Sequence, residues 1–529
     1  MSALNFAIGR LETVGDHCNA IVVKEVRQAL KSRQFVGTFV LLLLVAWGGS
    51  IFGVSMVGDS IEYGSSAEGF FVLFFMILCV ASLVIVPYAA YRSIVEERAE
   101  NTLELVQITA LSPRQIVWGK SLSALVQVLV YFSAITPFIA FTSLIPGFDF
   151  VHTAFDLGAL LVVAFVFSSV ALAIGAQTKN KISQSFGSLG VIVLSLIGMA
   201  IFAQLSFTMG YIVSLAEPAV WWAIAIGVFL AISTAFLCQQ IAIAQLTFES
   251  DNRSSGIRLT VTGQWLIAWL AVLVFVAVFS RGPSGTDFFG IIVLTTIFIT
   301  VAALYVIAEP EGISRRVARG LPRTRRMRML WVPFLPGGTR GLIFGLTSLA
   351  LMAVVAVLAM SWDSRTGSHF SSTSNEFSAS AVLIAYAVIY MGAGAWLTRL
   401  FRRVMANFSP GHLLALLLLG TLLLIVLETL WHFLSSTHVR DFEPIDVVNP
   451  VITVGVVYDN KTSAGLAGIE AAIAAVLALV INWRAMFRAA REVLNNPVRA
   501  QIELEAVRRK EAQAAALAGG LLEASVPAS

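Results

Sequence analysis

The residues of this chain that could do chemistry are concentrated in one polar segment, residues 93–122, between two long apolar stretches. Four carboxylates stand close together there, at Glu96, Glu97, Glu100 and Glu104. Apolar residues recur beside them at helical spacing, which gives an apolar stripe along an acidic helix. Such a surface is suited to contact with another protein, and it offers no general acid, base or nucleophile in a catalytic arrangement.

A strong helix-start signal follows the acidic residues. Ser112 is a natural N-cap, Pro113 suits the first helical position, and Gln115 completes a Ser-x-x-Gln capping box. We therefore predict a helix, a sharp turn at 110–112, and a second helix that runs through Lys120 into the next apolar stretch. A tight helix-turn-helix of this kind offers another protein a rigid contact. The alternative is a structured loop that only braces the two apolar stretches.

The run Gly119-Lys120-Ser121 is similar to the end of a phosphate-binding loop. That motif requires a glycine five residues before Gly119, where this chain has Arg114, and it requires a strand before the loop. No other segment supplies a nucleotide-binding fold. The six histidines show no paired spacing for a metal ion. We predict no catalytic, cofactor-binding or metal-binding residues.

Among the ionisable residues inside apolar stretches, Glu428, His432 and Glu470 are the candidates for an intramembrane role. Ionisable side chains within membrane spans are costly, and they often face a cavity or an ion pathway. These three lie near the ends of their stretches, so side chains that reach the lipid headgroups explain them equally well.

Twelve apolar stretches must position these residues. Hydrophobic residues make up 58% of the chain and charged residues 12%, which does not suit a soluble protein of this size. A stretch of about 20 residues is enough for a helix across the hydrocarbon core. We predict an all-α polytopic membrane protein of about twelve transmembrane helices, six plus six, with no large soluble domain. The predicted spans are 36–57, 70–91, 123–145, 155–176, 185–204, 219–241, 262–280, 287–308, 341–361, 380–400, 411–434 and 464–483.

The basic residues fall on one side of these spans. If the connections alternate between inside and outside, 31 of the 35 lysines and arginines lie inside, and only Arg281, Arg365, Arg440 and Lys461 lie outside. Positive loops are retained in the cytoplasm, so both termini are predicted to be cytoplasmic. The net charge of +4 is then a sign of topology, and no nucleic-acid partner is expected.

The spans define three regions. Residues 1–250 form a six-helix domain that contains segment 93–122, residues 251–483 form a second six-helix module that does not repeat the first, and 484–529 form a cytoplasmic helical tail. Segment 19–34 has an apolar face and basic residues mostly elsewhere. It is predicted to be an interfacial helix on the lipid bilayer, and an ordinary basic flank of the first span is the alternative. Its polar and apolar positions include Lys24, Glu25, Arg27 and Leu30.

The chain resembles type-2 ABC transporter permeases over residues 19 to about 247. The resemblance is carried by Glu-x-x-x-Asn-Thr-Leu-Glu-Leu from Glu97 and by Thr-x-Leu-Ser-Pro-Arg-Gln-Ile-Val-x-Gly-Lys up to Lys120. It implies that segment 93–122 is the coupling segment that docks on an ATP-binding subunit, and that 19–34 matches the family's connecting helix. The coupling residues that it implies are Glu96, Glu97, Glu100, Thr102, Leu103, Glu104, Leu111, Ser112, Pro113, Gln115, Gly119 and Lys120.

The resemblance also implies a function. The chain would be the permease subunit of an ATP-driven exporter in the plasma (bacterial inner) membrane, as a homodimer or paired with a related permease. It would not itself be an enzyme, because ATP and magnesium would be bound by separate ABC ATP-binding subunits. Two other functions remain open from the residues alone: an ion-coupled secondary carrier of six plus six helices, and a non-transporting membrane scaffold.

Overall fold

A computed structural model confirms the fold class. It describes residues 20–57, 66–99, 112–145, 149–178, 180–212, 217–248, 251–279, 285–322, 324–365, 370–405, 408–435, 444–459, 464–495 and a few residues after 500. Every regular element within these residues is helical, and twelve helical segments are long and apolar enough to cross a membrane. The protein is an all-α polytopic membrane protein, and the described residues include no large soluble domain.

The helical segments overlap all twelve predicted spans. Two of them run well past the predicted ends: the second covers Glu68–Arg98 and the last covers Ala464–Asn495. The extension of the second span is important for the site, because it carries Glu96 and Glu97 on the same continuous helix as the apolar residues before them. The described part of the last helix ends at Asn495.

Packing divides the chain into two compact units. One consists of Met1–Thr247 with Leu266–Ala271, and the other of Phe248–Trp265 with Val272–Ser529. The helices of the first unit are α2 (Ala20–Lys31), α3 (Arg33–Val57), α4 (Ser66–Val80), the π-helical turn η2 (Ala81–Ile85), α5 (Val86–Ala99), α7 (Pro113–Thr142), α8 (Phe150–Gln177), α9 (Lys181–Ile212) and α10 (Pro218–Leu246).

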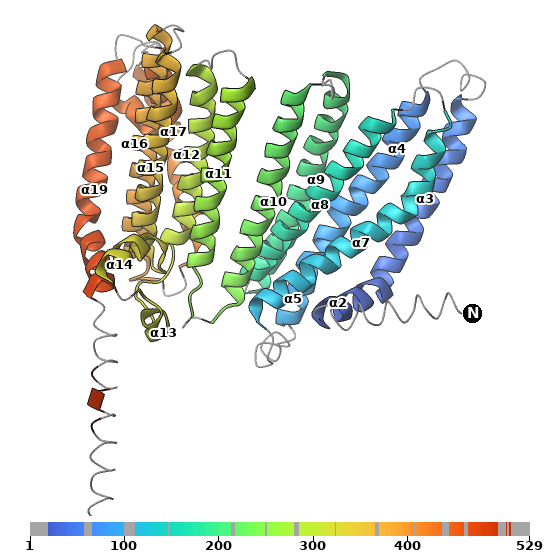
Figure 1. Cartoon of the computed structure of the whole chain (residues 1–529), viewed down its shortest axis with the longest axis horizontal. Helices are drawn as coiled ribbons and strands as arrows, with labels where there is room; N and C mark the ends of the chain where they lie inside the picture. Colours follow the sequence, from blue (N-terminus) through green and yellow to red (C-terminus); the bar gives the residue numbers. More distant parts are fainter. Residues whose placement is uncertain are drawn as a thin grey trace, which may run out of the picture. The chain divides into compact units, whose positions relative to one another are not determined.

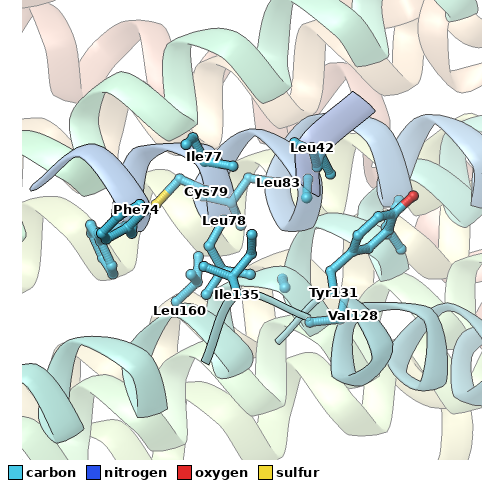
Figure 2. Close-up of a cluster of buried hydrophobic side chains, with 14 of the residues drawn as sticks. Leu42, Phe74, Ile77, Leu78, Cys79, Leu83, Val128, Tyr131, Ile135 and Leu160 are labelled. Atoms are coloured by element: carbon cyan, nitrogen blue, oxygen red, sulfur yellow. The ribbon is translucent and has the colours of Figure 1, made fainter. Parts of the chain in front are cut away.

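The core of the first unit is built where α3, α4, α7 and α8 meet. Figure 2 shows side chains from all four helices converging, among them Leu42, Leu78, Ile135 and Leu160. Lipid tails are as apolar as these side chains, so their burial stabilises the unit mainly through close packing. Below this core, α2 lies crosswise at the end of α3 and α7 and packs against both (Figure 1).

The second span contains a local change of helix type. Residues Ala81–Ile85 form a π-helical turn, and Pro87 is the second residue after it. A proline within a helix has no N–H to donate, and its ring clashes with the carbonyl group four residues earlier. A π turn widens the helix at this point and accommodates both effects. The helix then continues as α5 to Ala99 without a break.

The second unit, like the first, contains long helices, and it also contains several short ones. Its helices are α11 (Ser255–Phe279), α12 (Gly285–Ile307), α13 (Arg315–Arg319), α14 (Arg325–Trp331), η3 (Val332–Phe334), α15 (Gly338–Arg365), α16 (Phe370–Phe401), α17 (Pro410–Ser435), η4 (Pro444–Val448), α18 (Pro450–Tyr458) and α19 (Ala464–Asn495).

Proline and glycine keep the segment between α12 and α15 irregular. Gly337 has a φ of +129°, a conformation that side chains other than glycine rarely adopt. Gly341 brings the start of α15 against the end of α12, where a Cβ atom would lie 2.9 Å from the backbone of Val306 and Ile307. The segment therefore folds as short helices joined by turns, which suits its proline and glycine residues.

The membrane topology can be tested by cysteine labelling. In a variant that lacks the native cysteines, Ser372→Cys and Asn460→Cys should react with a membrane-impermeant maleimide in intact cells. Arg326→Cys should react only after the cells are opened, because the segment around it carries the basic residues that are retained inside. The reverse pattern of labelling would overturn the assignment of inside and outside for the whole chain.

Candidate functional site

The first turn of α7 has the capping box that the sequence predicts. The Ser112 side chain accepts a hydrogen bond from the backbone N–H of Gln115 at 3.3 Å. The Gln115 side chain accepts one from the backbone N–H of Ser112 at 2.9 Å. Pro113 occupies the first helical position, where its missing N–H costs no hydrogen bond. These bonds fix the point at which the chain enters α7 from residues 100–111.

Ser112→Ala should weaken this entry point without unfolding the chain. The substitution removes one hydrogen bond of the capping box, which should cost about 0.5–2 kcal/mol of helix stability. Amide hydrogen exchange in residues 113–117 should become correspondingly faster, and Ser112→Thr, which keeps the hydroxyl group, should stay close to the wild type. Equal exchange in Ser112→Ala and the wild type would show that the cap does not hold this helix end.

A buried lysine joins three helices just beyond the cap. The Lys120 side chain of α7 is 2% exposed, and its Nζ atom lies 3.0 Å from Glu97 Oε1 of α5 and 3.2 Å from Glu25 Oε1 of α2. The two carboxylates are themselves 19% and 12% exposed. An ammonium group is rarely buried unless it is paired, and here two carboxylates pair with it. We call Lys120, Glu97 and Glu25 the Lys120 triad.

The triad joins the two segments that the sequence singles out separately. Glu25 belongs to the predicted interfacial helix, and Glu97 and Lys120 belong to the predicted coupling segment. Lys24 adds a weaker contact, with its Nζ atom 3.9 Å from Glu97 Oε1 and a side chain that is 60% exposed. On α2, Leu30 is half-buried whereas Arg27 is exposed, and the interfacial position of this helix stays a prediction.

The end of α5 is tied to a fourth helix. Arg98 donates hydrogen bonds from Nη1 to the carbonyl oxygens of Ala176 at 3.0 Å and Thr178 at 2.7 Å. Both carbonyl groups lie at the C-terminal end of α8, where backbone oxygens lack partners within the helix and where a positive charge is favourable. The base of α5 is thus connected to α2 and α7 through Glu97 and to α8 through Arg98.

A polar cavity of about 320 Å³ lies beside the triad. It is lined by residues of α2, α3, η2, α5 and α7 and is partly open. Charged side chains line it at Arg92, Glu96 and Lys120, and amides line it at Gln28 and Gln127. Glu96 is paired with Arg92 one turn earlier on α5, but its side chain remains 54% exposed. Glu96 is therefore accessible to another protein, whereas Glu97 is mostly enclosed.

Of the remaining predicted coupling residues, one is described by the structure and five are not. Gly119 is buried in α7, together with Ile116 and Val117, which pack against α8 and α10. The others lie outside the described residues, so the apolar stripe and the turn at 110–111 stay predictions. The residues outside the described part are Glu100, Thr102, Leu103, Glu104 and Leu111.

In the second unit, the predicted intramembrane residues are enclosed by protein. Glu428 and His432 of α17 are 2% and 8% exposed, and His432 Nε2 lies 2.6 Å from Oδ1 of Asp446 in η4. Glu470 is half-buried on α19. Headgroup contact therefore does not explain Glu428 or His432. Asp446 was not among the predicted residues, because it lies in the connection between the predicted spans 411–434 and 464–483.

Two buried arginines were also not predicted as site residues. Arg258 and Arg340 of the second unit are both 0% exposed. Arg258 Nη2 lies 2.8 Å from Glu309 Oε2, and Arg340 Nη1 lies 3.1 Å from Glu492 Oε2. In the sequence, both arginines belong to the 31 basic residues predicted to lie inside, and the prediction gave them no other role. Arg340 follows Pro336-Gly337-Gly338 in the sequence, which is a local clue, whereas Arg258 binds the carbonyl group of Pro333 from 75 residues away and has no such clue.

Comparison of the chain with models of protein families, with curated proteins and with solved structures found no match.

Proposed function

We propose that this chain is the membrane-spanning permease subunit of an ATP-driven exporter, and that segment 93–122 couples it to separate ATP-binding subunits. The observation that carries this proposal is the Lys120 triad. It lies where the chain leaves α5 and enters α7, on the side predicted to be cytoplasmic. A displacement of residues 100–111 would reach α5 and α7 directly, and it would reach α2 through Glu25.

Rigidity is what such a coupling needs. A segment that is already ordered loses little free energy when it binds a partner, so more of the binding energy is available to move the helices. The capping box, the triad and the Arg98 contacts order the base of the first unit at three separate points. Glu97 then acts as a positioning residue within this base, and Glu96 is the acid that is available to the partner.

The proposed assembly consists of two copies of the chain, or one copy and a related permease, with two ATP-binding subunits. It lies in the plasma (bacterial inner) membrane. ATP binding would close the two ATP-binding subunits and move the docked segments, which would tilt the helices of the first unit between inward-facing and outward-facing states. ATP and magnesium would stay on the partner subunits.

Site-specific crosslinking tests the proposal. A photoreactive amino acid at position 96 of the full-length chain, expressed in its own host, should crosslink to a subunit that hydrolyses ATP. The same amino acid at position 460, predicted to be outside, is the matched control and should give no such crosslink. Co-purification of this subunit should be weakened at least tenfold by Glu96→Lys with Glu104→Lys.

The outcomes separate the proposal from its alternatives. Reconstituted wild-type chain should raise the ATP hydrolysis of the partner subunit severalfold, and the double charge reversal should abolish this stimulation. A chain that transports a solute in response to an ion gradient, with no ATP-hydrolysing subunit crosslinked at position 96, would be a secondary carrier. A chain that does neither would be a scaffold. Either result would overturn the exporter proposal.

A further inference from the structure

Three side chains with metal-ligating atoms meet in the second unit. They are Glu428 and His432 of α17 and Asp446 of η4, and one ligand atom from each lies within 4.8 Å of the others. All three are buried, with exposed fractions of 2%, 8% and 3%. Among the residues that the structure describes, no other group of three or more His, Cys, Asp or Glu side chains meets in this way. We call these residues the α17 cluster.

Local structure explains how the cluster forms. Glu428 and His432 are four residues apart on one helix, so their side chains lie on the same face. Asp446 comes from a short 3-10 helix that is held from two sides. The Thr453 hydroxyl group donates a hydrogen bond to the carbonyl oxygen of Asp446 at 3.0 Å, and the Tyr386 hydroxyl group donates one to the carbonyl oxygen of Val447 at 2.5 Å. The three ligand groups are thus held on fixed elements.

The buried carboxylate of Glu428 would be stabilised by a positive charge beside it. The Asn449 side chain lies near this carboxylate and favours its charged form through a hydrogen-bond interaction, but within the described structure no donor lies within 3.5 Å of either Glu428 oxygen in hydrogen-bonding geometry, and neither oxygen has exposed surface. Burying a carboxylate without partners is costly, and buried charges are usually paired or bound to metal ions. His432 directs its Nε2 atom at Asp446. The cluster therefore has two carboxylates for one imidazole, which is an excess of negative charge.

We propose that the α17 cluster binds a divalent transition-metal ion, with zinc as the ion that fits it best. Imidazole nitrogen and carboxylate oxygen are both zinc ligands, and three protein ligands leave the fourth tetrahedral position to a water molecule. Calcium requires six to eight oxygen ligands, and magnesium prefers oxygen in an octahedral shell. The mixed nitrogen and oxygen set of this cluster favours zinc over both.

Binding of the ion would change the cluster in a defined way. At bond lengths of about 2.1 Å, tetrahedral zinc separates two of its ligand atoms by about 3.4 Å. His432 Nε2 and Asp446 Oδ1 are 2.6 Å apart, so the ion would take the place of their shared proton and open the pair by roughly 0.8 Å. Zinc binding would release that proton, and it would crosslink α17 to η4.

Zinc binding to the purified chain tests this proposal. The full-length protein, stripped of metal with a chelator in detergent, should bind about one zinc ion per chain and release a proton on binding. Glu428→Gln and Asp446→Asn should each lower the zinc affinity at least 100-fold. Glu470→Gln removes a carboxylate on α19 that does not belong to the cluster, and it should change the affinity less than threefold.

A second measurement guards against variants that fail to fold. Cobalt in place of zinc should give the visible absorption of a four-coordinate ion in the wild type and in Glu470→Gln, and excess magnesium should not abolish it. Glu428→Gln keeps the shape of the side chain, and its melting temperature should no longer rise with added zinc, unlike that of the wild type. Absence of zinc binding to the folded wild type, or equal binding to folded Glu428→Gln, would overturn the proposal.

Discussion

Lys120→Met should lower the free energy of unfolding by about 3–5 kcal/mol, the range found when one partner of a buried ion pair is removed. At an effective dielectric constant of about 20, each of the two Lys120 contacts is worth roughly 5 kcal/mol before desolvation is subtracted. The methionine would leave Glu97 and Glu25 close together without the buried ammonium group. Unfolding in mixed detergent micelles, followed by loss of helix signal, measures the effect.

Charge removal provides the control for this experiment. The triple variant Lys120→Met, Glu97→Gln, Glu25→Gln has no buried charge at the triad and should recover most of the lost stability. Lys24→Met removes an exposed lysine that contacts the same carboxylate at 3.9 Å, and it should change stability by about 0.5 kcal/mol or less. A triple variant no more stable than Lys120→Met would show that unpaired charge is not the cause.

Arg258→Met should be comparably destabilising to the second unit. The guanidinium group donates to the carbonyl oxygens of Pro333 at 2.8 Å and Gly337 at 3.1 Å, and it pairs with Glu309. Its loss would leave those buried acceptors and a mostly enclosed carboxylate without their donor, at a cost of about 3–5 kcal/mol. Unfolding curves and the rate of limited proteolysis within residues 309–340 should both report it.

Arg316→Met is the matched control in the same unit. Arg316 also pairs with an acid, Asp251, but its side chain is 68% exposed. Water replaces most of what an exposed ion pair contributes, so the unfolding curve should stay close to that of the wild type. If Arg258→Met and Arg316→Met gave equal shifts, burial would not be what makes the Arg258 contacts stabilising.

The sequence predicts the long helices well because the bilayer fixes their length. A helix needs about 20 apolar residues to cross the hydrocarbon core, and that run is visible without any knowledge of tertiary contacts. The start of α7 was equally predictable, because the capping box uses only residues within one turn. Both signals are local, and local signals can be read from a single sequence.

The partners of charged residues could not be predicted. Lys120 and Glu25 are 95 positions apart, and only the packing of α2 against α7 brings them together. In the sequence, Glu97 looked like one more acid of an exposed cluster, and its enclosure depends on which face of α5 meets α7. The same holds for Asp446, which reaches His432 only because η4 folds back onto α17.

The short elements between the last spans were missed for a different reason. No element was predicted between spans 411–434 and 464–483, yet η4 and α18 lie there. Helices of five and nine residues are too short for a periodic pattern to stand out. The one local signal was Asn449 before Pro450, since the Asn449 side chain caps α18 by accepting from Val451 and Ile452.

The π-helical turn at Ala81–Ile85 also sets the rotational phase of everything after it. A π turn holds about one residue more than an α turn, and each residue advances an α-helix by about 100°, so the same residues wound as a regular α-helix would rotate the whole of α5 by about that amount. Glu97 would turn away from Lys120, and Arg98 would turn away from the end of α8. The second span can therefore exchange one apolar residue for another, but at its present length it cannot lose the π turn without dismantling the base of the first unit.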